Sequence, residues 1–206
     1  MTTRYVAVDL ETTSLDTSIA FPLEIAAVSF DPHTPGTYEH LENFVPYHER
    51  HVVNQAEPEA LTVNRYYERR LYRDMLDQVA TDHAIDRLVD LLDGATLVGA
   101  HTAYDAAILW QWMRDRRPDL GRAPWHFRLY DVEVAAAALL GLDEIPSLKK
   151  AAGMFGLTFA TLTGAHTAYG DACLAADVCS AVITRRATVD TILTPETVVA
   201  LDDHEA

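Results

Sequence analysis

Three short segments of this sequence place acidic residues at spacings suited to metal binding. The first holds Asp9 and Glu11, two residues apart at the end of an alternating, β-branched segment. Residues i and i+2 of a strand project from one face, about 6–7 Å apart. Two such carboxylates can bind one hard divalent cation or share two. The same spacing recurs at Asp131 and Glu133 and in the polar segment 203–205, but only Asp9 and Glu11 leave an apolar strand.

The second segment contains Asp105. It follows a predicted buried strand, residues 96–99, and a short turn, and it falls in the first turn of a predicted helix. Thr102 and Asp105 have the spacing of an N-terminal capping box, which explains the acid without any catalysis. Two interpretations of Asp105 therefore stay open, a capping residue or a metal ligand.

The third segment contains His166 and Asp171. Five residues along a helix do not share a face. If the helix begins near Thr167 or Ala168, however, His166 lies on the preceding loop and can fold back over Asp171. The alternative is a helix-start acid beside an unrelated loop histidine. Four other histidines have no paired ligand spacing and are expected at the surface: His33, His40, His48 and His51.

The elements that must position these residues follow from hydrophobic periodicity and turn signals. Strands are predicted over residues 4–10, 23–30, 38–45, 96–99 and 127–130, the first three as antiparallel neighbours. From residue 57 onward the sequence pattern becomes helical. Helices are predicted over 82–93, 103–114, 132–140 and 168–185, and a further helix is predicted to begin at Ser147. Thr81 is the predicted N-cap of the helix over 82–93, which Gly94 ends. Strands first, then strands alternating with helices, indicate a mixed α/β sheet covered by helices.

Length and composition predict one globular domain. The chain has 206 residues, and we expect a single domain over 1–186 followed by a loosely held tail over 187–206. No apolar run approaches the roughly 20 residues of a membrane span, and the N-terminus leads directly into a strand pattern without a signal-peptide hydrophobic region. We therefore expect a cytoplasmic protein. Cys173 and Cys179 point in different directions on one predicted helix and are expected to be buried small hydrophobes.

The formal net charge of −15 is unusual for a nucleic-acid-binding protein, because phosphate contacts favour positive charge. Bound cations would neutralise part of this charge, and an enzyme that grips a few terminal nucleotides needs only a local basic patch. Three groups of basic residues are candidates, although each is also typical of a solvated helix face. They are Arg65, Arg69, Arg70 and Arg73; Arg114, Arg116 and Arg117; and Lys149 and Lys150.

Taken together, the three acidic segments resemble the three motifs of the DEDDh group, the DnaQ-like 3′→5′ exonucleases. The segment Asp9-Leu10-Glu11-Thr12-Thr13-Ser14-Leu15 resembles the first motif, Asp-x-Glu-Thr-Thr-Gly-Leu. His166-x-Ala168-x-x-Asp171 resembles the third, whose histidine marks this branch. A Ser147-Leu148 helix precedes that motif, as in the family, and the resemblance covers about residues 5–185. It implies an RNase H-like fold.

Two positions depart from the family pattern. The second motif is usually His-Asn-x-x-Phe-Asp, and here it is Ala100-His101-Thr102-Ala103-Tyr104-Asp105, so His101 occupies the asparagine position. Ser14 stands where the first motif usually has glycine. The first change concerns a substrate contact, and the acid at the end of the motif is kept.

The resemblance implies hydrolysis of phosphodiester bonds from a 3′ end with two divalent cations, Mg²⁺ or Mn²⁺. Four carboxylates in one cleft repel one another, so such a site is stable only if cations bind there or several of the acids are protonated. Two bound cations would hold the scissile phosphate between the attacking water and the leaving group. Asp9 would bridge both ions, Glu11 and Asp171 would complete the ion that activates water, and Asp105 would hold the other through water. His166 would be the general base, with His101 as its rival.

Substrate contacts and partners are also implied by the resemblance. The substrate contacts would be made by Thr12, Thr13, Leu15, His101 and Tyr104. The expected substrate is the 3′ end of single-stranded or mismatched DNA, as in proofreading and repair, and a DNA polymerase is a conceivable partner. Trimming of RNA 3′ ends is the first alternative. A non-catalytic nucleic-acid or polymerase-binding module and an unrelated acidic α/β protein with a structural cation are the others.

Overall fold

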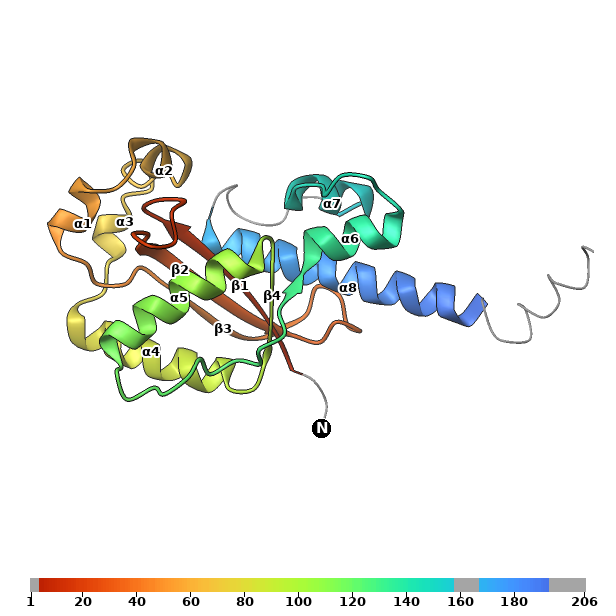
Figure 1. Ribbon diagram of the computed structural model, residues 1–206, viewed down its shortest axis with the longest axis horizontal. Helices are drawn as coiled ribbons and strands as arrows, with labels where there is room; N and C mark the ends of the chain where they lie inside the picture. Colours follow the sequence, from red (N-terminus) through yellow and green to blue (C-terminus); the bar gives the residue numbers. More distant parts are fainter. Residues whose placement is uncertain (1–3, 158–166, 193–206) are drawn as a thin grey trace, which may run out of the picture.

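A five-stranded mixed sheet forms the centre of the protein (Figure 1). The computed structural model describes residues 4–157 and 167–192, and for residues 187–192 it describes the backbone alone. The strand order is β3-β2-β1-β4-β5. Strands β1 (Tyr5–Thr12), β2 (Pro22–Phe30) and β3 (Tyr38–Phe44) pair antiparallel, while β4 (Thr96–Gly99) and β5 (Tyr130–Asp131) continue the sheet in parallel. The predicted mixed sheet with three antiparallel N-terminal strands is confirmed.

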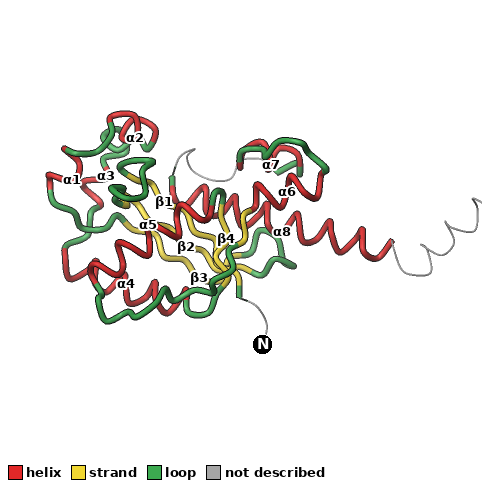
Figure 2. Tube along the Cα trace, in the orientation of Figure 1, coloured by secondary structure: helices red, strands yellow, loops and turns green. Residues whose placement is uncertain are grey.

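Helices cover both faces of this sheet (Figure 2). Helices α4 (Gln78–Leu92) and α5 (Thr102–Arg116) pack against the face that carries Val6, Val8 and Leu10. Helices α6 (Val132–Leu140), α7 (Leu148–Met154) and α8 (Ala168–Ile192) cover the face that carries Ala7. Since side chains alternate along a strand, Asp9 and Glu11 share the face of Ala7 and are directed toward α8.

Three short helices lie together at one end of the sheet, near the carboxyl end of β1 (Figure 1). They are α1 (Arg50–Asn54), α2 (Pro58–Val63) and α3 (Leu71–Asp74). A small separate core of Leu23, Val45, Tyr66 and Leu71 holds them against the sheet. The end of β3 is fixed to this region by a hydrogen bond of 3.0 Å from the Leu76 N–H to the Val45 carbonyl.

Several predicted boundaries were wrong. Strand β1 continues to Thr12 because β2 still pairs with it there, so Asp9 and Glu11 lie within the strand. Helix α4 begins at Gln78, and its N-cap is Asp77, whose carboxylate accepts from the Ala80 N–H. The predicted N-cap Thr81 is buried inside the helix, where its hydroxyl accepts from the Tyr47 N–H at 2.9 Å.

Three further expectations need correction. The strand expected over 127–130 is reduced to Tyr130–Asp131, which pair with Val98 and Gly99 at the end of β4, while Phe127 is exposed. Thr102 does not cap α5: its hydroxyl donates to the carbonyls of Gly99 (2.9 Å) and Tyr130 (3.1 Å). The last helix, predicted over 168–185, continues to Ile192 as α8.

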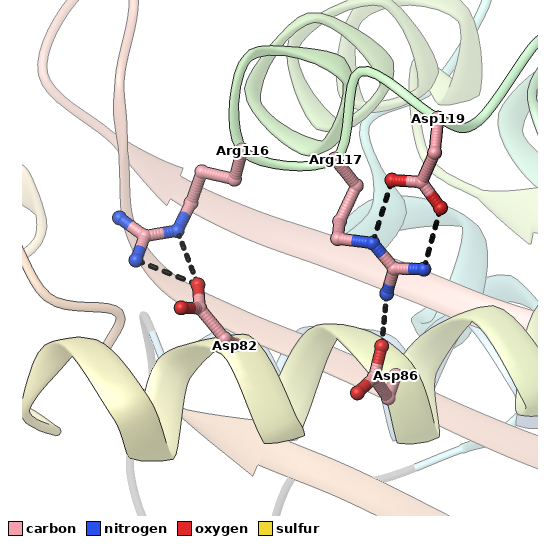
Figure 3. A network of polar contacts seen from close by, with 5 residues as sticks. All are labelled: Asp82, Asp86, Arg116, Arg117 and Asp119. Carbon is pink, nitrogen blue, oxygen red and sulfur yellow. Dashed lines mark hydrogen bonds and ion pairs between the residues drawn. The ribbon is translucent and has the colours of Figure 1, made fainter.

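Ion pairs join α4 to α5 on the outside of the molecule (Figure 3). Arg116 donates to Asp82 at 2.8 and 3.1 Å. The guanidinium of Arg117 lies between Asp86 and Asp119, and Nη2 donates to Asp119 at 2.8 Å. Two of the three arginines proposed for phosphate binding in this helix are thus already paired with carboxylates.

The cysteines and the helix lengths also bear on the predictions from composition. Cys173 and Cys179 are free thiols buried on α8, as expected. Within the part of the chain that the structure describes, no helix is both long enough and apolar enough to cross a bilayer.

Candidate active site

Three carboxylates meet where β1 passes the start of α8. Asp9, Glu11 and Asp171 each offer an oxygen, and these atoms all lie within 4.8 Å of one another. Asp9 and Asp171 are partly buried and Glu11 is buried. The strand spacing brings the first two together, and α8 contributes the third across the face of the sheet. An all-oxygen site of this kind suits a hard divalent cation such as Mg²⁺ or Mn²⁺.

Asp171 owes its position to the way α8 begins. The helix starts at Ala168, and the Thr167 hydroxyl accepts from the Gly170 N–H at 3.0 Å, the contact of an N-cap residue. Asp171 lies in the first turn, where its N–H donates to the Thr167 carbonyl. His166 precedes this cap and lies outside the described residues. Its predicted place on a loop before the helix therefore stays a prediction.

Asp105 approaches the same site from the opposite side of the sheet. Strand β4 stops at Gly99, while β1 continues for several residues beyond the pairing of Ala7 with Val98. The Leu10 N–H therefore has no strand partner on that side, and it donates to the Asp105 carboxylate instead. Asp105 is buried and lies close enough to Asp9 to raise its pKa, but it is not among the three mutually closest ligands.

Gly99 permits this arrangement. A Cβ at this position would lie 3.0 Å from the Val8 carbonyl oxygen and 3.3 Å from the Thr102 hydroxyl. The end of β4 can approach β1 this closely only without a side chain. The turn from β4 into the helix that carries Asp105 therefore depends on glycine.

The carboxylates raise one another's pKa. Burial raises the pKa of Asp9 well above its ordinary value, and the charges of Asp105, Glu11 and Asp171 add to the effect. Burial, with Glu24 and Asp171 nearby, raises the pKa of Glu11 from 4.5 to about 7. Burial likewise raises the pKa of Asp105, although the hydrogen bond from the Leu10 N–H acts to lower it. Such a cluster is unfavourable when fully charged and is stabilised by a cation.

Glu24 is a further buried carboxylate at the site, and the sequence reasoning missed it. It pairs directly with Glu11 across the β1–β2 ladder. Arg69 donates to both of its oxygens at 2.7 Å, and Glu24 also accepts from the Ala168 N–H at 3.2 Å. A lone acid inside the apolar segment Leu-Glu-Ile-Ala-Ala-Val-Ser-Phe was the available signal, because a buried charge needs a partner.

The turn after β1 is held rigidly by its own polar groups. Thr12 and Tyr104 share a hydrogen bond of 2.7 Å between their hydroxyls, and Tyr104 also donates to the Ser14 carbonyl. The Thr13 hydroxyl accepts from the Phe21 N–H at 2.9 Å. Three of the predicted substrate contacts therefore have bonds within the protein, and Leu15 is 82 % exposed at the tip of this turn.

The histidines differ in their surroundings. His101 is exposed and adopts a left-handed backbone conformation (φ 53°), with its ring 6.0 Å from that of Tyr104. Asn and His are among the non-glycine residues enriched in this conformation, which explains how His101 occupies a position where the motif usually has asparagine. The surface location predicted for His48 was wrong. His48 is buried, and its ring nitrogens form hydrogen bonds with the Pro46 carbonyl and the Tyr66 hydroxyl.

Comparison with known proteins identifies the family. The sequence profile of the RNase_T exonuclease family matches residues 6–179, most of the chain. The chain belongs to the DEDDh exonuclease family. This family member is thereby a nuclease with an RNase H-like fold, as the motifs implied. A search of curated proteins found no match.

Solved structures with the same fold include several of exonuclease I. The enzyme of Methylocaldum szegediense has a TM-score of 0.66 and 15 % identity, covering 93 % of this chain and 43 % of its own. Exonuclease I of E. coli in complex with a dA16 oligonucleotide has a TM-score of 0.64 and 16 % identity, covering 91 % and 42 %. Its complex with a dT13 oligonucleotide has a TM-score of 0.66 and 15 % identity, covering 93 % and 43 %. The exonuclease fold described here thus spans less than half of those chains.

Proposed function

We propose that this family member is a divalent-metal-dependent 3′→5′ exonuclease that removes nucleoside 5′-monophosphates from the end of single-stranded or mismatched DNA. The observation that carries the proposal is the meeting of Asp9, Glu11 and Asp171 within 4.8 Å, in a chain that belongs to an exonuclease family. Related structures of exonuclease I hold single-stranded oligonucleotides, which supports DNA as the substrate.

The donor set fits Mg²⁺ or Mn²⁺. All three ligand groups are carboxylates. Burial, followed by the charges of neighbouring carboxylates, raises the pKa of Asp9 and of Glu11, and a bound cation would offset this repulsion. In the proposal Asp9, Glu11 and Asp171 hold the cation, and Asp105 contributes to a second one from α5. A bound cation of this kind polarises the phosphate and makes the attacking water more acidic.

The remaining roles fall to neighbouring groups. His166 takes the proton of the attacking water as the general base. Leu15, exposed at the tip of the turn after β1, contacts the terminal nucleotide together with His101 and the edge of Tyr104. Thr12 and Thr13, the other residues assigned to the substrate site, hold that turn in place through their hydrogen bonds.

Digestion of a 5′-labelled strand tests the proposal. Single-stranded DNA, a mismatched duplex and RNA are incubated with the protein and Mg²⁺ or Mn²⁺, and the products are resolved by length. We expect a ladder that shortens from the 3′ end, which Asp9→Ala and Asp171→Ala abolish and the exposed control Asp90→Asn does not. Parental activity in either alanine variant would overturn the assignment. Faster digestion of RNA would instead make the protein an RNA-trimming enzyme.

The cellular role depends on partners. The family resemblance allows a polymerase-associated proofreading function as well as independent repair. Co-purification of the tagged protein with a DNA polymerase, followed by measurement of exonuclease activity on a mismatched primer end, distinguishes these roles.

A further inference from the structure

Outside the carboxylate cluster, arginine and tyrosine are concentrated in residues 65–73. This segment holds four of the 16 basic residues of the chain and three of its nine tyrosines, with one acid, Glu68. Residues 66, 67 and 72 line a cavity of about 530 Å³, together with His48 and Arg50. We call Arg50, Tyr66, Tyr67, Arg70, Tyr72 and Arg73 the Arg-Tyr surface. This concentration of arginines stands out in a chain whose formal net charge is −15.

The tyrosines of this surface present aromatic faces on a fixed support. Tyr67 is 62 % exposed and Tyr72 is 46 % exposed, whereas Tyr66 between them is buried. Tyr66 contacts Tyr67 edge-on, with ring centroids 5.2 Å apart, and Tyr72 at 6.3 Å. Exposure of two aromatic rings to water is unfavourable. Exposed rings that are held in place by a buried ring are typical of surfaces that bind another planar group.

The support is rigid because the Tyr66 hydroxyl is engaged. His48 contacts the Pro46 carbonyl through Nδ1 and the Tyr66 hydroxyl through Nε2, both at 3.0 Å. A carbonyl only accepts, so Nδ1 carries the proton, and in the neutral ring Nε2 accepts from Tyr66. Burial lowers the pKa of His48 and keeps the ring neutral. Tyr66 is thus held in one orientation beneath the two exposed rings.

Positive charge lies beside these rings. Arg50 lines the cavity, and Arg70 and Arg73 are exposed at the N-cap and within α3, the helix that carries Tyr72. Among the described residues, no carboxylate lies within ion-pair distance of these three arginines, whereas Glu68 is already paired with Arg65 at 2.7 Å. Uncompensated arginines next to exposed aromatic rings match the chemistry of single-stranded nucleic acid, with its phosphates and flat bases.

The Arg-Tyr surface adjoins the turn after β1. The Asn64 side chain donates to the Thr12 carbonyl at 2.8 Å, and Tyr66 follows two residues later. Two residues span at most about 7 Å, so the tyrosine support begins directly beside the turn that carries Leu15. Glu57, just before α2, fixes the same turn by accepting from the Ser14 hydroxyl at 2.8 Å.

We propose that the Arg-Tyr surface binds the single strand on the 5′ side of the two nucleotides that the scissile phosphate joins. Bases stack on Tyr67 and Tyr72, and Arg50, Arg70 and Arg73 contact the phosphates. The proposal rests on the proposed function, because it assumes that the terminal nucleotide lies at the carboxylates. It accounts for how a chain of net charge −15 holds a polyanion.

Binding of oligonucleotides of two lengths tests this proposal. The affinities of 5′-fluorescein-labelled dT₂ and dT₁₅ are measured by anisotropy with Ca²⁺ in place of Mg²⁺. We expect the parent to bind dT₁₅ more tightly, and Tyr67→Ala/Tyr72→Ala to lose about 10- to 100-fold in affinity for dT₁₅, since each stacked base contributes strongly. Affinity for dT₂ and the rate of its hydrolysis with Mg²⁺ should stay at the parental value.

Two further variants make the result specific. Tyr67→Phe/Tyr72→Phe keeps the rings and should bind dT₁₅ like the parent, and Phe127→Ala, which removes an exposed ring elsewhere, should also have no effect. Arg70→Ala/Arg73→Ala should weaken dT₁₅ binding and reduce its dependence on salt concentration. Thermal melting of each variant verifies that it is folded.

The outcomes separate this proposal from the proposed function. If the parent digests DNA and the double-alanine tyrosine variant binds dT₁₅ as the parent does, the Arg-Tyr surface is overturned while the exonuclease assignment stands. If the parent neither digests nor binds any oligonucleotide, the proposed function is overturned and this proposal with it.

Discussion

The carboxylate of Glu24 accepts a hydrogen bond from the backbone N–H of Ala168 at 3.2 Å. This bond fastens the first turn of α8 to β2, opposite the β1 position that carries Glu11. Because Asp171 lies in that same turn, Glu24 joins the two elements that supply the carboxylate cluster. Arg69 in turn compensates its charge, with both side chains largely shielded from solvent.

Removal of this arginine should weaken the fold and the cluster together. Arg69→Ala leaves Glu24 buried beside Glu11 without its cation, and breaking a buried pair costs about 3–5 kcal/mol. Arg69→Ala/Glu24→Gln should be less destabilised than Arg69→Ala alone, because the uncompensated charge is gone. Urea unfolding measures both, and Mn²⁺ affinity by electron paramagnetic resonance reports the cluster.

The surface pair of Arg65 with Glu68 serves as the control for this prediction. The two side chains are 50 % and 69 % exposed, and exposed pairs contribute only about 0–1 kcal/mol. Arg65→Ala should therefore lower the free energy of unfolding little. Equal losses for Arg65→Ala and Arg69→Ala would contradict a special role for the Glu24 pair.

The stability of the metal-free protein should fall as the pH rises through the window set by Glu11. Its pKa is raised from 4.5 to about 7 by burial and by Glu24 and Asp171. Between these values folded Glu11 is more protonated than unfolded Glu11, so the free energy of unfolding decreases with pH, and Glu11 contributes about 3 kcal/mol of this decrease. Asp9 and Asp105, whose pKa values are also raised, add to it. Glu11→Gln should therefore show a smaller decrease than the parent, as measured by urea unfolding in EDTA at pH 4.5 to 7.5.

Addition of Mg²⁺ should reverse the loss at the upper end of that window. A cation bound to the folded chain stabilises it by mass action, so the parent should gain stability at pH 7.5 and Glu11→Gln should gain less. A parent whose stability follows that of Glu11→Gln at every pH, with and without Mg²⁺, contradicts the assignment of the raised pKa to Glu11.

Replacement of Gly99 should disturb the approach of β4 to β1. The Cβ of Gly99→Ala would lie 3.0 Å from the Val8 carbonyl, which is held in the sheet and cannot move freely. Overpacking of this kind costs about 1–3 kcal/mol, and the turn to Asp105 should shift with it. Gly153→Ala in α7 is the control, because nothing lies within 4 Å of its Cβ. Thermal unfolding should show destabilisation only for Gly99→Ala.

The two candidate bases should respond differently to substitution by asparagine. His166→Asn should lower kcat by about 10²- to 10⁴-fold, the usual contribution of a general base, and leave affinity for a 3′ end unchanged. His101→Asn should retain stability, because asparagine tolerates the left-handed backbone found there. It should also retain activity, because asparagine is the residue that the second motif usually has at this substrate contact. His101→Val should lose about 1–2 kcal/mol of stability, because that backbone conformation is strained for valine. A loss of kcat in His101→Asn alone would reassign the base.

Short-range sequence patterns were sufficient to predict much of the fold. The strand of residues 96–99 and the helix of residues 132–140 have the predicted bounds, since each is delimited by turn or capping residues within the sequence itself. Asp131 caps the second of these by accepting from the N–H groups of Glu133 and Val134, as expected of acids at a helix start. The errors at Thr81 and Thr102 arose because their hydroxyls bond to distant backbone groups.

The sequence by itself determined which carboxylates could act together along one element: the alternation of β1 places Asp9 and Glu11 on one face, and the start of α8 places Asp171 in its first turn. These relations depend on residues a few positions apart, so periodicity reveals them. Only the tertiary structure decided that this turn meets β1, that Glu24 and Arg69 hold it there, and that tyrosines and arginines gather beside it. Contacts between residues 24, 69 and 168 are long-range, and they follow from the packing of whole elements, which leaves no periodic signal in the chain.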